Sequence, residues 1–135
     1  MQKARPTVLI AEDDATARSA LSIRLTQAGF DVITASDGAA AVDLLEKRTP
    51  DAALLDVQMP RLDGFAVCEH IRRNPATQKM PVFFLTGTTD GVIRNHLGTL
   101  TSTVGGDHHF TKPYDGKLIA MLLWDAVGGP RTPTG

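Results

Sequence analysis

The chain has 135 residues, enough for about one domain that can bury a core without metals or disulfides. Its composition is ordinary for a soluble protein, and the net charge of -1 gives no bulk attraction to nucleic acid or anionic membranes. No apolar run approaches the roughly 20 residues of a membrane span and the chain opens without an export segment, so we expect a cytoplasmic protein with no direct nucleic-acid or membrane partner.

Five short apolar runs alternate with helical patterns along the chain. The runs predict strands over residues 7–11, 30–35, 52–56, 81–85 and 109–111. Apolar residues at helical spacing predict helices over 17–28, 39–47, 65–72, 93–104 and 118–124. This alternation predicts an α/β fold, a doubly wound five-stranded parallel sheet with helices on both faces, and the common flavodoxin-like strand order is 2-1-3-4-5.

The same patterns divide the chain into three parts. Residues 1–6 form an N-terminal extension, residues 7–127 form the domain, and residues 128–135 form a flexible tail or linker rich in glycine and proline. The last part is too short to fold, and the chain contains no basic recognition helix. A stand-alone domain and a domain of a longer protein both remain open.

Acidic residues end the first and third apolar runs. Glu12-Asp13-Asp14 follows residues 7–11, and Asp14 is expected to cap the next helix. Asp56 ends the third run and has two interpretations, a helix cap or a chemical group at the carboxyl end of a buried strand. Strands one and three are neighbours in the order 2-1-3-4-5. That order therefore predicts one crevice that contains Glu12, Asp13 and Asp56, with Thr86 and Lys112 beside it.

Three converging carboxylates favour a divalent cation that prefers oxygen ligands, because like charges repel without a counter-charge. Mg²⁺ fits better than Zn²⁺, since no Cys/His ligand set accompanies the acids. The Lys112 ammonium and the Thr86 hydroxyl add donors that suit a phosphoryl group. A carboxylate beside Mg²⁺ is a competent nucleophile, so we predict that Asp56 becomes an aspartyl phosphate.

Two other features are interpreted as structural. Cys68 is the single cysteine, and its neighbours indicate the buried face of a helix and not a reactive thiol. His108 and His109 are adjacent in a predicted strand, where successive side chains point to opposite faces, which argues against a shared metal site.

Four motifs together resemble the signature of the receiver domains of two-component response regulators (CheY-like domains). The resemblance covers about Val8 to Val127, nearly the whole chain. Its motifs are Glu12-Asp13, Leu54-Leu55-Asp56 with Met59-Pro60 and Asp63-Gly64, Leu85-Thr86-Gly87, and Thr111-Lys112-Pro113. Each motif is weak alone, but four in the right order at strand ends are specific.

The resemblance implies a phosphoacceptor chemistry for these residues. Asp56 would accept a phosphoryl group from a histidine kinase or a histidine phosphotransfer protein. Asp13, Asp56 and the backbone carbonyl of Gln58 would bind Mg²⁺, with Glu12 assisting through water. Such a domain catalyses only its own phosphorylation and dephosphorylation, and is not otherwise an enzyme.

The resemblance also implies how the phosphoryl group is sensed. Thr86 would hydrogen-bond the group, Lys112 would pair with it, and the Lys112-Pro113 peptide would be cis. The signal would leave through the face of helix four, strand five and helix five, toward a downstream protein or an output domain. The sequence does not decide whether phosphorylation drives dimerisation.

The chain departs from the family pattern at two places on that face. His109 stands where relatives usually have Tyr or Phe as a rotamer switch, and the segment from Thr86 to Lys112 is several residues longer than usual. A switch histidine would make the coupling pH-sensitive, because imidazole changes charge near neutral pH. The alternative is an exposed imidazole at the edge of the sheet.

Three competing functions keep this fold. A degenerate receiver would act as a phosphorylation-independent interaction module, but the intact acidic set argues against it. A phosphatase with an aspartyl intermediate would be favoured by a carboxylate two residues after the nucleophile, where this chain has Gln58. A flavin carrier is opposed by the acids that end the first strand, which would repel the flavin phosphate. The cognate kinase, the signal and the phosphoryl lifetime stay open.

Overall fold

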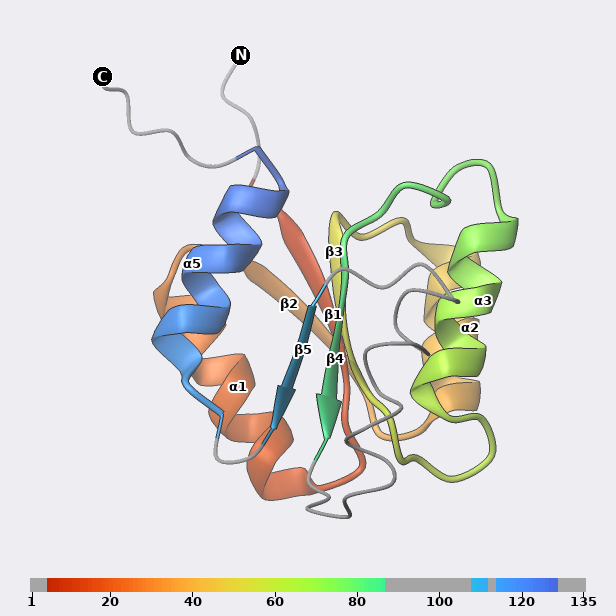
Figure 1. Ribbon diagram of the computed structural model, residues 1–135, viewed down its shortest axis with the longest axis horizontal. Coiled ribbons are helices and arrows are strands. Elements are labelled where there is room, and N and C mark those ends of the chain that lie inside the picture. Colours follow the sequence, from red (N-terminus) through yellow and green to blue (C-terminus); the bar gives the residue numbers. More distant parts are fainter. Residues whose placement is uncertain (1–4, 87–107, 112–113, 129–135) are drawn as a thin grey trace.

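A five-stranded parallel sheet forms the centre of the protein (Figure 1). The computed structural model describes residues 5–86, 108–111 and 114–128. The strands are β1 (Thr7–Ala11), β2 (Asp31–Ala35), β3 (Ala52–Asp56), β4 (Val82–Thr86) and β5 (His108–Thr111). The helices within the described residues are α1 (Ala15–Gln27), α2 (Gly38–Lys47), α3 (Gly64–Arg73) and α5 (Gly116–Ala126).

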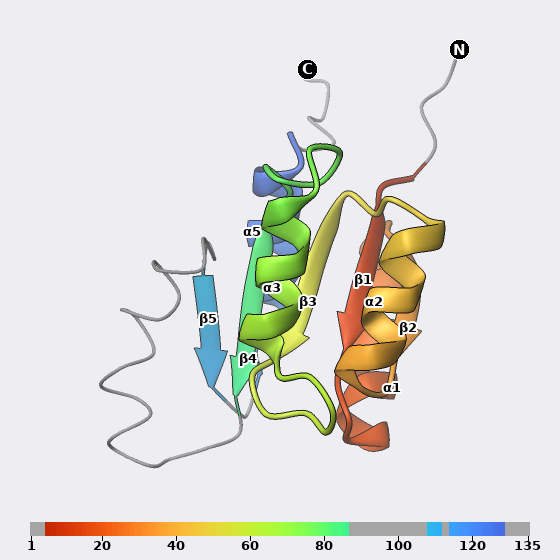
Figure 2. The same ribbon diagram turned by 90° about the vertical axis from the view of Figure 1, so that its right-hand side faces the viewer.

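The predicted architecture is confirmed. The strand order is β2-β1-β3-β4-β5, with every pairing parallel. Helices α1 and α5 cover one face of the sheet, and α2 and α3 cover the other (Figures 1 and 2). The helix predicted over 93–104 and the Lys112-Pro113 peptide lie outside the described residues, and the domain boundaries stay predictions.

Alternating strand residues supply two separate cores. The core under α2 and α3 contains Leu9, Leu55 and Phe84, and the core under α1 and α5 contains Ile10, Leu54 and Phe83. Every residue of β3 and β4 is buried because both strands have helices on both sides. Cys68 is fully buried in the first core, as its neighbours predicted.

Aspartates begin all four described helices, and three of them precede a glycine. The carboxylates of Asp37, Asp63 and Asp115 accept backbone N–H groups at the starts of α2, α3 and α5. Asp14 caps α1, as predicted, by accepting the N–H of Thr16 at 3.2 Å. Since Asp63 caps the helix that follows β3, the interpretation of Asp56 as a helix cap is wrong.

The carboxyl-terminal end of α1 is held from two sides. The Arg5 guanidinium donates to the carbonyl oxygens of Thr26, Gly29 and Phe30 at 2.8–3.0 Å. From α5, the Trp124 indole N–H donates to the Ala28 carbonyl at 2.8 Å. Gly29 follows α1 with a φ of +105°, a left-handed conformation that favours glycine. No helix in the described part of the chain is long and apolar enough to cross a membrane.

Candidate acidic site at the carboxyl ends of the strands

The register of β1 and β3 brings the predicted acids together. Ala11, the last residue of β1, pairs with Leu55 of β3. Glu12, which follows β1, and Asp56, which ends β3, therefore lie at the same level of the sheet. Both strands run in the same direction, and their carboxyl ends open onto one edge. The strand order therefore brings Glu12 and Asp56, which are 44 residues apart in the sequence, into one site.

Glu12, Asp13 and Asp56 form one cluster. A carboxylate oxygen from each lies within 4.8 Å of the others, which is close enough for one metal ion to contact all three. Glu12 is fully buried, Asp56 is 6% exposed, and Asp13 is exposed. The cluster is thus open to solvent on the side of Asp13 and closed on the side of Glu12.

Glu12 is held by groups from three segments. Its Oε2 accepts the backbone N–H of Asp14 at 3.2 Å, and its Oε1 accepts the Tyr114 hydroxyl at 3.3 Å. The Arg18 guanidinium donates to the Glu12 backbone carbonyl at 2.8 Å. Neither Tyr114 nor Arg18 was predicted as a site residue. The sequence places both residues close to predicted site residues, since Tyr114 directly follows Lys112-Pro113 and Arg18 lies in the first turns of α1.

Asp56 has an unusual acidity in this setting. Burial, followed by the neighbouring carboxyl groups of Glu12 and Asp13, raises the pKa of Asp56 to about 8. The backbone N–H of Gln58 donates to Asp56 Oδ1 at 3.0 Å and opposes this rise. Without a cation, Asp56 is therefore a much weaker acid than an ordinary aspartate.

The other predicted residues lie at the ends of β4 and β5. Thr86 is fully buried at the end of β4 and pairs with Thr111. His109 pairs with Phe84, so it shares a face of the sheet with Thr86, and it is exposed on the edge strand. This exposure fits the interpretation as an edge imidazole, and the switch role stays a prediction. Lys112 lies outside the described residues.

The donor set suits a divalent cation with a preference for oxygen. All three clustered groups are carboxylates, and burial, together with the neighbouring carboxyl groups, raises the pKa of Asp56. A bound cation would relieve the repulsion between these groups. The acidic cluster therefore fits Mg²⁺, which prefers carboxylate oxygens and tolerates a half-open site that retains water.

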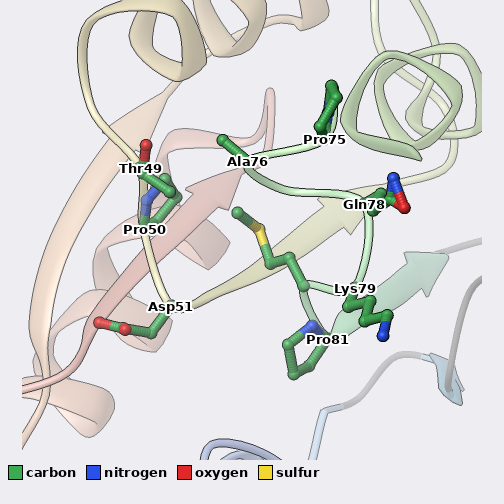
Figure 3. A pocket seen from close by; sticks show the side chains of 9 residues that line it. Thr49, Pro50, Asp51, Pro75, Ala76, Gln78, Lys79 and Pro81 are labelled. Atoms are coloured by element: carbon green, nitrogen blue, oxygen red, sulfur yellow. The ribbon is translucent and has the colours of Figure 1, made fainter. Parts of the chain in front are cut away.

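A separate hollow lies at the opposite edge of the sheet. Figure 3 shows its lining residues, which come from the segment before β3 and the segment between α3 and β4. Its volume is about 660 Å³, and it contains none of the clustered acids. Its one carboxylate, Asp51, accepts the Thr7 N–H at 2.8 Å and so joins β1 to the start of β3. This hollow therefore has no part in the acidic site.

The fold and the cluster define the class: a doubly wound α/β protein with a carboxylate crevice at the ends of β1 and β3. The family model of the response regulator receiver domain matches residues 8–123. The chain belongs to this family, as its four motifs predicted.

Individual relatives agree with this assignment. The DNA-binding dual master transcriptional regulator RpaA of Synechocystis is 38% identical over 110 residues, which cover 82% of this chain and 44% of RpaA. The chain spans about half the length of the curated relatives it matches.

Two solved structures show the same fold. A response regulator from Chloroflexus aurantiacus, described as putative, has 28% identity and a TM-score of 0.82, with 93% of this chain and 99% of that chain covered. The receiver domain of the sensor histidine kinase PA1611 from Pseudomonas aeruginosa has 25% identity and a TM-score of 0.81, with 93% and 100% covered. That receiver has a magnesium ion coordinated in its active-site cleft.

Proposed function

We propose that this receiver domain is the phosphoacceptor of a two-component phosphorelay, and that Asp56 takes the phosphoryl group with the help of Mg²⁺. The observation that carries the proposal is the convergence of Asp56 with Glu12 and Asp13 at the carboxyl ends of β1 and β3. Burying like charges together costs free energy, so such a cluster is expected where a cation and an anionic group are bound.

The proposed reaction is an in-line transfer to Asp56. One carboxylate oxygen of Asp56 attacks the phosphorus, the P–N bond to the donor histidine breaks, and its electron pair stays on the imidazole nitrogen. The Gln58 N–H donates to Asp56 Oδ1 at 3.0 Å, which orients the carboxylate for the attack. We assign to the Thr86 hydroxyl and the Lys112 ammonium the role of donors to the transferred group.

The cation has a separate part in the proposal. The carboxylates of Asp13 and Asp56, with the backbone carbonyl of Gln58, would hold Mg²⁺, and Glu12 would assist through water. When bound, Mg²⁺ supplies the positive charge that keeps Asp56 ionised and balances the phosphoryl oxygens. This matters because the pKa of Asp56, about 8 without a cation, lowers the share of the nucleophilic form at neutral pH.

The proposal includes the partners of the domain. The donor is a histidine kinase or a histidine phosphotransfer protein, and the receiver catalyses only its own phosphorylation and dephosphorylation. The recipient is a downstream protein or an output domain, which contacts the face that includes β5 and α5, with or without dimerisation of the receiver. RpaA, a transcriptional regulator of which this chain covers 44%, is one example of a relative with further sequence.

Intact mass spectrometry tests the proposal. The protein is incubated with acetyl phosphate, with and without Mg²⁺, as wild type and as Asp56→Asn. We expect a gain of one phosphoryl group that requires both Mg²⁺ and Asp56. Asp51→Asn is the matched control, because this carboxylate lies at the opposite edge of the sheet, and it should be phosphorylated like the wild type.

If no adduct is found, either the site is not competent or it loses the phosphoryl group rapidly. A second measurement separates these two cases. Beryllofluoride imitates the phosphoryl group and is not hydrolysed, so binding to it would show a competent site that dephosphorylates itself rapidly. Failure to bind beryllofluoride in the presence of Mg²⁺ would contradict the proposal and favour the phosphorylation-independent interaction module.

A further inference from the structure

Tyr114 connects the end of the chain to the buried acid at its beginning. It lies after β5, next to Asp115, the residue that caps α5. Its hydroxyl donates to Glu12 Oε1 at 3.3 Å across a sequence separation of 102 residues. Its ring is half-buried and packs against the core under α1 and α5.

This hydrogen bond completes the fixation of the Glu12 carboxylate. Glu12 is fully buried, and its Oε2 already accepts the backbone N–H of Asp14 at 3.2 Å. With the Tyr114 hydroxyl on Oε1, each carboxylate oxygen has a donor, and the donors come from opposite ends of the chain. Rotation of the carboxylate would break at least one of the two bonds, so its plane is fixed relative to Asp13 and Asp56.

The contact between Tyr114 and Glu12 has a defined donor, because the Tyr114 hydroxyl donates to Glu12 Oε1 at 3.3 Å. Its partner is a carboxylate oxygen, which can only accept. In this hydrogen bond, tyrosine is therefore the donor and glutamate the acceptor.

We infer that Tyr114 is a positioning residue for the cation site: through its hydroxyl it holds Glu12 in the orientation that the metal requires. The inference rests on the proposed function, because it concerns the Mg²⁺ site of that function. Partners that orient a ligand commonly change metal affinity by 10–100-fold when they are removed. Tyr114 needs no contact with the cation to have this effect.

A purely structural role for the ring makes a different prediction. The ring lies beside a hollow of about 250 Å³ between α1 and the start of α5, and phenylalanine would fill the same space. If packing alone mattered, Tyr114→Phe would leave metal binding unchanged. The substitution thus separates the hydroxyl from the ring.

Isothermal titration calorimetry with MgCl₂ on the full chain measures this directly, without phosphorylation. We expect Tyr114→Phe to bind Mg²⁺ about tenfold more weakly than the wild type. The matched control is Trp124→Phe, which also removes an aromatic hydrogen-bond donor near α5, but one whose acceptor is the Ala28 carbonyl. This control should bind Mg²⁺ like the wild type.

A double-mutant cycle with Glu12→Gln assigns the effect to the pair. If Tyr114 acts through Glu12, Tyr114→Phe should have little further effect on Mg²⁺ affinity in the Glu12→Gln background. Equal affinity of wild type and Tyr114→Phe, or tighter binding by the variant, would overturn the inference alone. No Mg²⁺ binding by the wild type would overturn the proposed function, and the inference with it.

Discussion

The backbone of Gly64 lies directly against the backbone of Asp56. A Cβ atom on Gly64 would lie 2.5 Å from the Asp56 carbonyl oxygen and 3.0 Å from its carbonyl carbon. Gly64 also donates its N–H to the Val57 carbonyl at 3.1 Å. The start of α3 is therefore packed onto the end of β3, at the residue that carries the proposed nucleophile, and only a glycine allows this distance.

We predict that Gly64→Ala destabilises the protein and impairs phosphorylation together. The added methyl group meets backbone, which can give way only if β3 or α3 moves, and overpacking of this kind costs about 1–3 kcal/mol. Movement of β3 would displace Asp56 from Glu12 and Asp13. Urea unfolding measures the first effect, and the acetyl phosphate reaction followed by intact mass measures the second.

Gly116→Ala is a matched control for this prediction. Gly116 also follows a capping aspartate and begins a helix, but the three atoms nearest to its added Cβ all belong to the side chain of Arg24. Because the exposed Arg24 side chain can change its rotamer whereas the backbone of Asp56 cannot, we expect a smaller loss of stability than in Gly64→Ala. Equal behaviour of the two alanine variants would show that the Gly64 contact has no special role.

The high pKa of Asp56 predicts a pH-dependent stability of the metal-free protein. The pKa is about 8 in the folded protein and about 3.9 in an unfolded chain, so the folded state binds the proton more tightly. The resulting stabilisation is complete below about pH 4 and is lost as the pH rises to about 8, an effect on the order of a few kcal/mol. Urea unfolding in EDTA between pH 5 and 9 measures it.

Asp56→Asn and Mg²⁺ should each change this profile. The asparagine variant has no proton to lose at this position, so its stability should fall less toward pH 8 and exceed that of the wild type there. Mg²⁺ should stabilise the wild type more at pH 8 than at pH 5, because it favours the ionised carboxylate. A wild type whose stability rises between pH 5 and pH 8 without metal would contradict the assigned direction of the shift.

The acidic cluster was accessible from the sequence because it depends on strand ends. Two apolar runs stop at carboxylates, and a parallel sheet brings the carboxyl ends of neighbouring strands to one edge. The prediction of Glu12, Asp13 and Asp56 as neighbours needed only the strand order. The prediction that Asp14 caps α1 needed only local geometry, and both are confirmed.

Contacts between individual side chains were not accessible in this way. The Tyr114–Glu12 hydrogen bond joins the segment between β5 and α5 to the residue after β1, and no periodicity of the sequence reports that contact. Arg5 lies in a segment predicted as an N-terminal extension, yet its guanidinium contacts three carbonyl groups at the end of α1. Such contacts depend on the meeting of surfaces that the chain forms only after it folds.

The contacts of Arg5 predict a role in stability. Arg5→Ala removes hydrogen bonds to the carbonyls of Thr26, Gly29 and Phe30, so we expect a loss of about 1 kcal/mol. Arg73→Ala is the control, since its exposed ion pair with Glu69 on the same helix is expected to contribute less than about 0.5 kcal/mol. Urea unfolding of both variants compares them, and an equal small loss would contradict the prediction.

The two histidines of β5 allow a test of the switch hypothesis. His109 pairs with Phe84 and shares a face of the sheet with Thr86, whereas His108 packs edge-on against Phe83, in the core under α1 and α5, with ring centroids 5.0 Å apart. If His109 senses the phosphoryl group together with Thr86, the switch hypothesis predicts a response that depends on pH. The response of His109→Tyr should then be the same at pH 6 and pH 8.

Amide hydrogen exchange over residues 90–110 measures this response, with and without beryllofluoride and Mg²⁺, at both pH values. Protection factors are compared, because they remove the intrinsic pH dependence of exchange. We expect the change in protection to differ between pH 6 and pH 8 in the wild type and in His108→Tyr, and not in His109→Tyr. An identical change at both pH values in the wild type would leave His109 as an exposed imidazole on the edge strand.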